Sequence, residues 1–454
     1  MQAPFAKPLT LACGQTLNNR LAKAAMTEGL ADPLGRPTDA HVRLYGKWSA
    51  GGCALLITGN VMVDPRHLER PGNVIIGARP DRETLDRLRA WARAGTAGGT
   101  QLWMQLSHSG RQTPRSVNPR PKAPSPIRLA LPGGQYATPE PMTGREIEEV
   151  VARFALAAEV AKQTGFTGVQ VHAAHGYLLS EFLSTRTNRR SDEWGGSLEN
   201  RARLLRCVVR AIRARCGGAF PISVKLNSAD FQRGGFGEDD ALSVASSLAA
   251  DGIALLEISG GTYERPRMMG ILGIEPVDGK AGASTRAREA YFLDFASRLR
   301  KRVVLPLMVT GGFRSAAAMS DAIERDGIDM IGLARPLVHD PLAARALLEG
   351  RSSELDRWER RLGNPGGFFG VNSPVLALKA ASAFASMAWY YARLVEHGEG
   401  RAAANDLGIW RALLQLRMRE AAWLRARSRL VREHGTRPEE WGPPAAPGAQ
   451  LPMS

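Results

Sequence analysis

The sequence predicts an α/β fold, a (β/α)8 TIM barrel with an N-terminal hairpin and a helical C-terminal extension. Short apolar runs of strand type alternate with amphipathic helical segments as far as about residue 350. This alternation is the pattern of βαβ units built around a parallel sheet. Polar residues follow most of the apolar runs, as expected in a barrel whose site lies at the carboxyl ends of its strands.

Eight strands and eight helices can be assigned in order along the chain. The predicted strands are residues 21–25, 53–58, 100–105, 168–171, 222–225, 254–258, 303–309 and 329–332. The predicted helices are residues 40–50, 82–94, 144–164, 198–215, 241–250, 287–301, 315–324 and 341–348. Because every strand is followed by a helix, the count predicts a closed barrel in residues 1–350.

Two segments stand outside the strand–helix repeat. Residues 9–17 alternate apolar residues around Gly14, which predicts a small hairpin placed as a plug on the N-terminal face of the barrel. Residues 114–141 are rich in Pro, Gly and Ser and follow the third strand. A loop of this length in a compact domain is usually functional or mobile.

The character of the sequence changes after residue 350. Residues 373–396 and 407–433 have helical patterns, so residues 351–440 are predicted to form a helical extension that packs on the barrel or on a partner subunit. Residues 442–454 are rich in Pro and Ala, and the segment 441–454 is predicted to be disordered.

Composition excludes several classes of protein. The 454-residue chain has a formal net charge of +16, but its arginines are spread along the whole length, which argues against nucleic-acid binding. The four cysteines form no C-x-x-C pair, which argues against an iron–sulfur cluster or a structural zinc. No apolar run is long enough to cross a bilayer, and the first residues lack a secretory signal, so a cytoplasmic enzyme is expected.

The loops after the seventh and eighth strands predict a phosphate site. Gly311 and Gly312 allow backbone N–H groups to approach an anion, and Ser315 can cap the helix that follows. Arg335, directly after the eighth strand, can form a forked contact with the same phosphate. In this fold these two loops are the usual place for phosphate binding.

His172, His175 and Tyr177 form the sharpest local feature, just past the fourth strand. Two imidazoles and a phenol can donate hydrogen bonds to a carbonyl oxygen and deliver a proton. A metal site with Glu181 as third ligand, or histidines that simply pack in the core, are the alternatives. Lys225, at the end of the fifth strand, admits a Schiff-base role or a role as a fixed cation.

These residues resemble the Old Yellow Enzyme family of NAD(P)H:flavin oxidoreductases. The fourth strand continues into HAAHGYLLSEFLS (172–184) and then NRRSDEWGGSLENR (188–201), both close to signatures of that family. QLSHSGR (105–111) and LARP (333–336) agree with it as well. The resemblance extends from residue 1 to about residue 345.

The resemblance implies FMN as cofactor and NAD(P)H as electron donor, with an α,β-unsaturated carbonyl compound as the small-molecule substrate. His172 and His175 would bind the carbonyl, and Tyr177 would protonate the α-carbon after hydride transfer. Thr27 would lie near the flavin C4 carbonyl, and Lys225 near N1 and the C2 carbonyl. The residues implied to bind the flavin are Ala25, Met26, Thr27, Asn60, Gln105, Lys225, Gly311, Gly312, Phe313, Ala334 and Arg335.

The sequence also departs from that family. Ala25 and Glu28 differ from the residues of well-known relatives, so the resemblance does not fix the flavin potential or substrate access. Residues 351–454 contain neither the cysteine cluster nor the dinucleotide fingerprint of the larger members. Two other functions stay open: an FMN-dependent dehydrogenase or demethylase of an amine or hydroxylated substrate, and an interaction module whose terminal helices form a homodimer or bind another protein.

Overall fold

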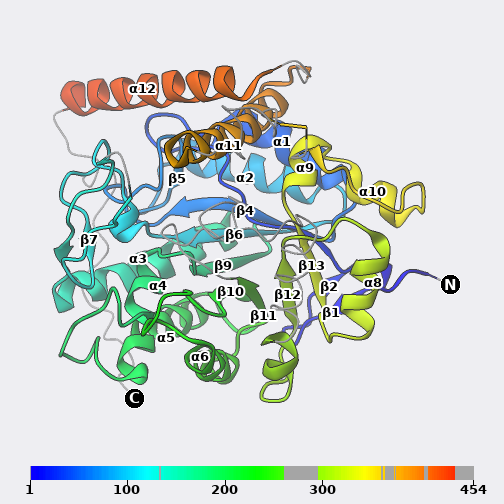
Figure 1. Ribbon diagram of the computed structural model, residues 1–454, viewed down its shortest axis with the longest axis horizontal. Helices are drawn as coiled ribbons and strands as arrows, with labels where there is room; N and C mark the ends of the chain where they lie inside the picture. Colours follow the sequence, from blue (N-terminus) through cyan, green and yellow to red (C-terminus); the bar gives the residue numbers. More distant parts are fainter. Residues whose placement is uncertain are drawn as a thin grey trace.

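A closed ring of eight parallel strands forms the centre of the molecule (Figure 1). The computed structural model describes residues 2–131, 134–259, 295–358, 361–362, 373, 375–402 and 407–434. The ring strands are β3 (Leu21–Lys23), β4 (Leu55–Met62), β6 (Gln101–Ser107), β9 (Gly168–Ala173), β10 (Ile222–Asn227), β11 (Leu255–Ser259), β12 (Leu307–Thr310) and β13 (Met330–Leu333). Pairing of β3 with both β4 and β13 closes the barrel, and β5 (Val74–Ile75) adds to β4 outside the ring.

The eight predicted strands are confirmed in order, and only their ends differ. The first strand ends at Lys23 rather than at residue 25, because Ala24 N–H makes the last ladder bond, to the Leu333 carbonyl at 2.8 Å. The seventh begins at Leu307 rather than at residue 303. Val303 and Leu305 are apolar because they pack in the core and not because they pair with a neighbouring strand, whereas Val304 between them is fully exposed.

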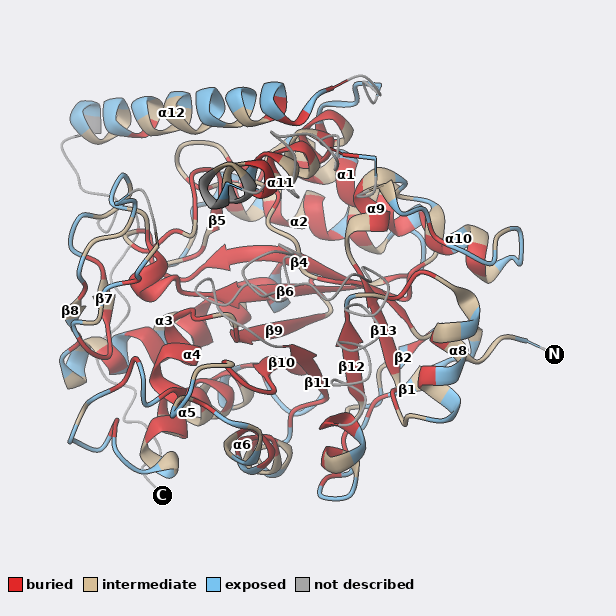
Figure 2. Ribbon diagram, viewed as in Figure 1, coloured by how far each residue is buried: buried red, intermediate tan, exposed pale blue. Residues whose placement is uncertain are grey.

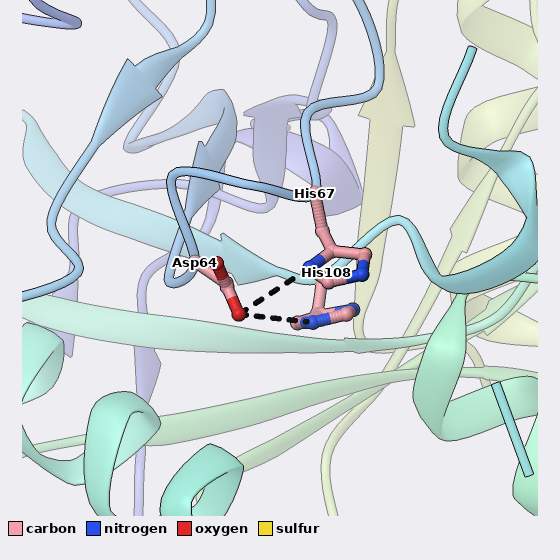
Figure 3. Close-up of side chains that lie close together, drawn as sticks. All are labelled: Asp64, His67 and His108. Carbon is pink, nitrogen blue, oxygen red and sulfur yellow. Dashed lines mark ion pairs between the residues drawn. The ribbon is translucent and has the colours of Figure 1, made fainter. Parts of the chain in front are cut away.

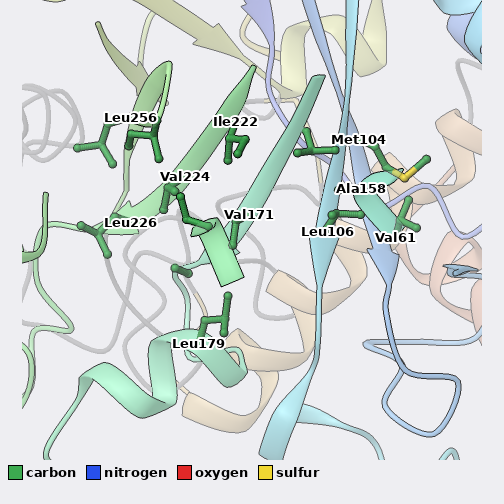
Figure 4. Close-up of a cluster of buried hydrophobic side chains, with 14 of the residues drawn as sticks. Val61, Met104, Leu106, Ala158, Val171, Leu179, Ile222, Val224, Leu226 and Leu256 are labelled. Atoms are coloured by element: carbon green, nitrogen blue, oxygen red, sulfur yellow. The ribbon is translucent and has the colours of Figure 1, made fainter. Parts of the chain in front are cut away.

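Apolar side chains between the strands and the surrounding helices form the core. Strand residues such as Val171, Val224 and Leu256 are at most 1% exposed, and they belong to one buried apolar cluster with the helix residues Ala158 and Leu179 (Figure 4). Strands buried on both faces read as continuous apolar runs in a sequence. The runs that predicted strands therefore mark the most buried part of the molecule, as the burial colouring shows (Figure 2).

Helices cover the outside of the ring, and most match the predictions. They are α1 (Asp39–Ala50), α2 (Arg82–Thr96), α3 (Gly144–Gln163), α4 (Leu178–Leu183), α5 (Leu198–Cys216), α6 (Glu238–Ala250), α8 (Ala316–Glu324), α9 (Arg335–His339) and α10 (Ala343–Leu348). Side chains cap several of them: Asp81 accepts from Thr84 N–H, and Ser315 accepts from Ala318 N–H. Of the predicted helix 287–301, residues 295–300 are helical and residues before 295 lie outside the described chain.

The predicted N-terminal hairpin is present as β1 (Leu9–Thr10) and β2 (Thr16–Leu17), paired antiparallel. Gln15 donates to the Thr167 carbonyl at 2.9 Å and accepts from the Trp103 indole at 3.0 Å. Thr167 directly precedes β9, so the hairpin lies at the amino end of the barrel, where a plug was predicted. The loop 114–141 is more ordered than predicted, because β7 (Lys122–Ala123) and β8 (Glu140–Pro141) pair within it.

The C-terminal extension consists of α11 (Leu376–Glu399) and α12 (Ile409–His434), which pack on each other beside α1 (Figure 1). The first helix begins three residues later than predicted, because the Ser373 hydroxyl accepts from Val375 N–H ahead of it. It ends at Gly400, which adopts the left-handed conformation that favours glycine. The predicted disordered segment 441–454 lies outside the described residues. Among the described helices, none has the length and apolar character that a bilayer crossing requires.

Hydrogen bonds from α12 to the barrel predict a measurable stabilisation. The Trp423 indole donates to the Ala31 carbonyl at 3.0 Å. Trp423→Phe removes this donor and should lower the free energy of unfolding by about 1 kcal/mol, since a carbonyl would lose its partner. Trp410→Phe is the matched control, because Trp410 is 42% exposed and is expected to change stability by less than about 0.5 kcal/mol. Urea unfolding monitored by circular dichroism measures both, and equal losses would contradict the assignment.

Candidate functional site

The carboxyl ends of the ring strands bring the predicted site residues to one rim. Asn60 pairs in register with Gln105 on the neighbouring strand. Lys225 pairs in register with His172 in the same way. Ala25, Met26 and Thr27 follow β3 and are partly exposed at this rim. The strand register therefore brings Asn60, Gln105, His172 and Lys225 toward the same edge of the barrel.

A buried polar network runs across the barrel interior below this rim. Lys225 Nζ lies 2.9 Å from Glu257 Oε1, and Thr310 donates to the same oxygen at 2.7 Å. Gln170 Nε2 donates to Glu257 Oε2 at 2.8 Å, and its Oε1 accepts from Gln105 at 2.7 Å. The amide nitrogen of Gln105 donates to Gln170, so the side-chain carbonyl oxygen of Gln105 is left to accept a hydrogen bond from a ligand.

The network defines the role that Lys225 can play. The Lys225 side chain is 4% exposed and that of Glu257 is fully buried. Water solvates neither group, so the two are stabilised by their contact with each other. A lysine that pairs with a buried carboxylate serves as its counter-ion, whereas a Schiff-base lysine needs a free nitrogen lone pair to attack a carbonyl. The arrangement therefore favours the fixed cation over the Schiff-base alternative.

His172, His175 and Tyr177 are brought together as predicted. The ring centroids of His172 and Tyr177 are 4.6 Å apart, and those of the two histidines are 5.1 Å apart. His175 has φ of +62°, a left-handed conformation that is uncommon outside glycine, and its amide donates to Asn227 Oδ1 at 3.3 Å. Its Nε2 lies 2.7 Å from Ser259 Oγ. This strained residue is held in place by the ends of two neighbouring strands.

Both imidazoles are neutral in this environment. Burial, together with the nearby His175 and Lys225, holds the pKa of His172 well below its ordinary value. Burial and the charge of Lys225 lower the pKa of His175 to about 3. His172 Nδ1 accepts from Ala174 N–H at 3.4 Å, which leaves the hydrogen on Nε2. The pair can therefore donate hydrogen bonds without carrying positive charge.

The lowered pKa values predict how the site responds to pH. Each imidazolium loses its proton at a pH below the pKa of a free histidine side chain. Both rings are therefore already neutral when the pH reaches that ordinary value. We expect the rate of carbonyl-substrate reduction to show no ionisation near 6.5 between about pH 5 and about pH 8. Stopped-flow measurement of the oxidative half-reaction across this range tests it. A step near pH 6.5 that disappears in His172→Asn would contradict the neutral state.

The alternative metal site at the histidine pair is not formed in the described residues. Glu181, its candidate third ligand, accepts instead from Arg111 N–H at 2.9 Å. No described carboxylate or thiol joins His172 and His175 at ligand spacing. In the described part of the chain, the two histidines face Tyr177 and Ser259 rather than a third ligand.

A second histidine cluster, which sequence reasoning missed, lies nearby (Figure 3). Asp64 follows β4, and its carboxylate faces Nδ1 of His67 at 3.3 Å and Nε2 of His108 at 3.8 Å. The two rings stack with their centroids 4.3 Å apart. Burial raises the pKa of the Asp64 carboxyl, but the two imidazoles and Arg66 outweigh it and hold that pKa well below its usual range.

The hydrogen bonds of this cluster argue against a metal ion, although its ligand atoms lie within 4.8 Å of one another. His67 Nε2 accepts from Lys122 N–H at 2.9 Å, and His108 Nδ1 accepts from Gly110 N–H at 3.1 Å. Because one nitrogen of each ring accepts a backbone hydrogen, the ring's own hydrogen sits on the nitrogen that faces Asp64, where a metal would need lone pairs. The cluster instead fastens the loop after β4 to the long loop after β6, which carries both His108 and Lys122.

The predicted phosphate loops have the required backbone. Gly311 and Gly312 have φ values of +115° and +82°, which other residues rarely adopt. A Cβ on Gly311 would meet no atom within 4 Å, so space is open beside it. The Arg335 guanidinium has no hydrogen bond or ion pair within the part of the chain described here. Phe313, by contrast, is buried in the core.

Comparison with known proteins identifies the family. The sequence model of the NADH:flavin oxidoreductase / NADH oxidase family matches residues 5–354. The chain belongs to this family. FMN is therefore the cofactor and NAD(P)H the electron donor, and the resemblance to Old Yellow Enzyme is confirmed. The match ends just before the C-terminal extension.

Two fungal relatives are similar over about three quarters of the chain. An NADH-dependent flavin oxidoreductase of Neonectria sp. (strain DH2) is 39% identical over 353 residues, which are 74% of this chain and 46% of that protein. One of Talaromyces variabilis is 37% identical over 360 residues, 76% of this chain and 86% of that protein. The chain thus spans about half the length of the first relative and most of the second.

Solved structures give the same fold. A 2-naphthoyl-CoA reductase in complex with 2-naphthoyl-CoA has a TM-score of 0.68 and 27% identity, covering 76% of this chain and 52% of that one. An Old Yellow Enzyme homologue from Zymomonas mobilis has a TM-score of 0.63 and 24% identity, covering 78% and 95%. The second likeness confirms the (β/α)8 barrel.

The residues of this flavin oxidoreductase fit an FMN. Open space at Gly311 suits a phosphate, as does Arg335, which has no side-chain partner among the described residues, and the buried Lys225 suits the electron-rich edge of the ring. Asn60 Oδ1 is buried without a hydrogen-bond partner in the described residues, so it offers an acceptor to a ligand N–H. The donors and acceptors therefore match both ends of the cofactor.

Glu28, a departure noted from the sequence, is a buried structural residue. It accepts from the Tyr45 hydroxyl and, at 2.9 Å, from Gly59 N–H. Lys23 lies next to it, donating to the Ile57 carbonyl at 2.6 Å, and burial lowers the pKa of Lys23 to about 8 despite the opposing charge of Glu28. This group fastens β3 to β4 below the rim.

The C-terminal helices reach the same rim, which the sequence did not predict. Arg427 donates to the carbonyls of Pro33 and Pro65, in the loops after β3 and β4. Arg70 lies 3.7 Å from the Tyr391 ring centroid and 2.8 Å from Glu420. A cleft of about 350 Å³ remains between the helices and these loops. The extension therefore packs against the loops at this rim and lines the cleft beside them.

Proposed function

We propose that this flavin oxidoreductase uses NAD(P)H to reduce the activated carbon–carbon double bond of an α,β-unsaturated carbonyl compound. The observation that carries the proposal is the neutral His172 and His175 pair beside Tyr177. Neutral N–H donors polarise a carbonyl oxygen without the cost of holding two positive charges. The printed names of the fungal relatives favour NADH as donor.

Each residue has a defined task in this reaction. His172 and one nitrogen of His175 donate hydrogen bonds to the carbonyl oxygen of the substrate, which withdraws electrons from its double bond. Tyr177 delivers a proton to the α-carbon. When bound, FMN supplies the hydride chemistry. The same face receives the nicotinamide first and the alkene second.

The remaining predicted residues bind the cofactor. Gln105 presents its carbonyl oxygen, and Lys225 presents its charge, to the pyrimidine side of the ring. Ala25 and Met26 line the ring, and Ala334 lies beside the phosphate residues. The backbone of Gly311, Gly312 and Phe313 and the guanidinium of Arg335 hold the phosphate.

Colour and two substrates test the proposal. The purified protein should be yellow, and NADH added without oxygen should bleach it. Cyclohexenone should then restore the colour. An amine or a hydroxylated compound, offered to the oxidised protein, should fail to bleach it; bleaching by either would favour the dehydrogenase or demethylase instead. A protein that is colourless and indifferent to FMN would refute the function altogether.

The interaction-module alternative is tested separately. A variant lacking residues 409–434 should lose activity because α12 forms part of the rim. If it keeps full activity and loses only binding to another protein, the extension serves association rather than catalysis.

A further inference from the structure

Glu69, which no family resemblance assigns, contacts two residues of the flavin site. Its Oε2 accepts from the Thr27 hydroxyl at 2.6 Å and from Asn60 Nδ2 at 2.6 Å. Glu69 lies in the loop between β4 and β5 and is half-buried. Two residues from separate strand ends thus give their hydrogens to one carboxylate oxygen.

This contact fixes the direction of both hydrogen bonds. A carboxylate only accepts, so the Thr27 hydrogen points to Glu69 and the Asn60 amide nitrogen must face it. Thr27 therefore offers the flavin only lone pairs. Asn60 offers only Oδ1, which is buried and has no partner in the described residues.

The polarity of this edge is the reverse of what the resemblance implies. A Thr27 near the flavin C4 carbonyl would be expected to donate to it and so favour the reduced, electron-rich ring. Here both side chains present oxygen, and a carboxylate stands behind them. Such a surface suits a ring N–H and disfavours added negative charge.

We propose that Glu69 is a positioning residue that lowers the reduction potential of the bound flavin by turning Thr27 and Asn60 into acceptors. The proposal rests on the proposed function, because it requires FMN in this site. Its consequence concerns the cofactor alone and needs no alkene. It is therefore separable from the choice of substrate.

The C-terminal helices hold Glu69 in this position. Its neighbour Arg70 stacks on Tyr391 and pairs with Glu420, while Arg70 N–H donates to Asn73 Oδ1 at 2.9 Å. Asn73 Nδ2 in turn donates to the Asn60 carbonyl at 3.3 Å. The loop is thus fixed on one side to the strand that carries Asn60 and on the other to α11 and α12.

The reduction potential of the FMN-loaded protein, measured without substrate against a redox dye, tests the proposal. Glu69→Gln removes the charge and lets the amide donate to Thr27, so the equilibrium should shift at least about tenfold toward reduced flavin, which is ~30 mV for a two-electron couple. Glu83→Gln is the matched control, since Glu83 lies at the surface and pairs there with Arg36 and Arg87. A shift below about twofold in Glu69→Gln would overturn the proposal.

Thr27→Val provides a second measurement if Glu69→Gln fails to retain FMN. Because Thr27 gives its hydrogen to Glu69 and presents only lone pairs to the flavin, its removal should leave the equilibrium unchanged or shift it toward reduced flavin. A tenfold fall would show that Thr27 donates to the flavin and would overturn the proposal. Failure of the proposed function would give a different result. The protein would then contain no FMN, or NADH would not bleach it, whereas failure of the present proposal leaves a bleachable flavin with an unchanged potential.

Glu420→Gln tests the part played by the extension. Glu420→Gln should shift the equilibrium toward reduced flavin, as Glu69→Gln does, but by a smaller factor. Glu399→Gln should leave this equilibrium unchanged. Glu399 pairs with Arg401 and Arg419, within the extension and its flanking residues, and is the control for charge on these helices. Identical potentials in the two variants would show that the helices do not position Glu69.

Discussion

Replacing Tyr177 with Phe should slow alkene reduction by about 10²- to 10⁴-fold, the usual contribution of a positioned general acid. Flavin reduction by NADH should change little, because that half-reaction needs no proton at the α-carbon. The side chain is only 3% exposed and its ring lies against His172, so Phe fills the same space. Stopped-flow absorbance of the flavin resolves the two half-reactions.

Tyr390→Phe is the matched control for this substitution, since it removes a phenol from α11, outside the proposed site. It should leave both half-reactions within about twofold of the parent. Equal loss in both half-reactions of Tyr177→Phe would mean that Tyr177 positions ligands rather than donates the proton. A normal rate of alkene reduction would assign the proton to another group.

Lys225→Met should cost about 3–5 kcal/mol of unfolding free energy in the FMN-free protein, because it leaves the buried Glu257 carboxylate without its cation. The double variant Lys225→Met/Glu257→Gln should recover much of this loss, since a neutral amide can still bond Gln170 and Thr310. Urea unfolding of the three proteins gives both differences.

Lys122→Met is the surface control for this measurement. Its partners Glu140 and Glu146 are 45% and 28% exposed, so the loss should stay within about 1 kcal/mol. If Lys225→Met lowers the free energy of unfolding no more than Lys122→Met does, water must reach the Glu257 carboxylate despite its burial. If the double variant is no better than the single one, the cost comes from packing rather than from the unpaired charge.

The barrel was predictable because its strands are buried on both faces and so appear as uninterrupted apolar runs. The His172, His175 and Tyr177 group was predictable because all three lie within six residues of one strand end. Ser315 was recognised as a cap for the same reason, since a cap and its helix are neighbours in sequence. Features formed by residues close together in the sequence can therefore be predicted before the structure is known.

Residues that act across the chain gave no such signal. Glu257 lies inside a predicted strand, but nothing in the sequence couples it to Gln170 or Lys225, since these pairs form only when the barrel closes. Glu69 and the group of Asp64, His67 and His108 depend on how loops from different strands meet. The helical pattern of α12 was visible, whereas its docking on the rim depends on contacts with loops hundreds of residues away.

The long reach of α12 has a consequence for biosynthesis. Its Trp423 and Arg427 bond to residues that lie 392 and 394 positions earlier in the chain. A barrel emerging from the ribosome therefore exposes the loops after its first two strands until this last helix has been made. Domains fold as they are synthesised, at about 5–20 residues per second. We expect nascent chains to complete their barrel before they complete their catalytic face, so that they gain activity only after α12 has docked.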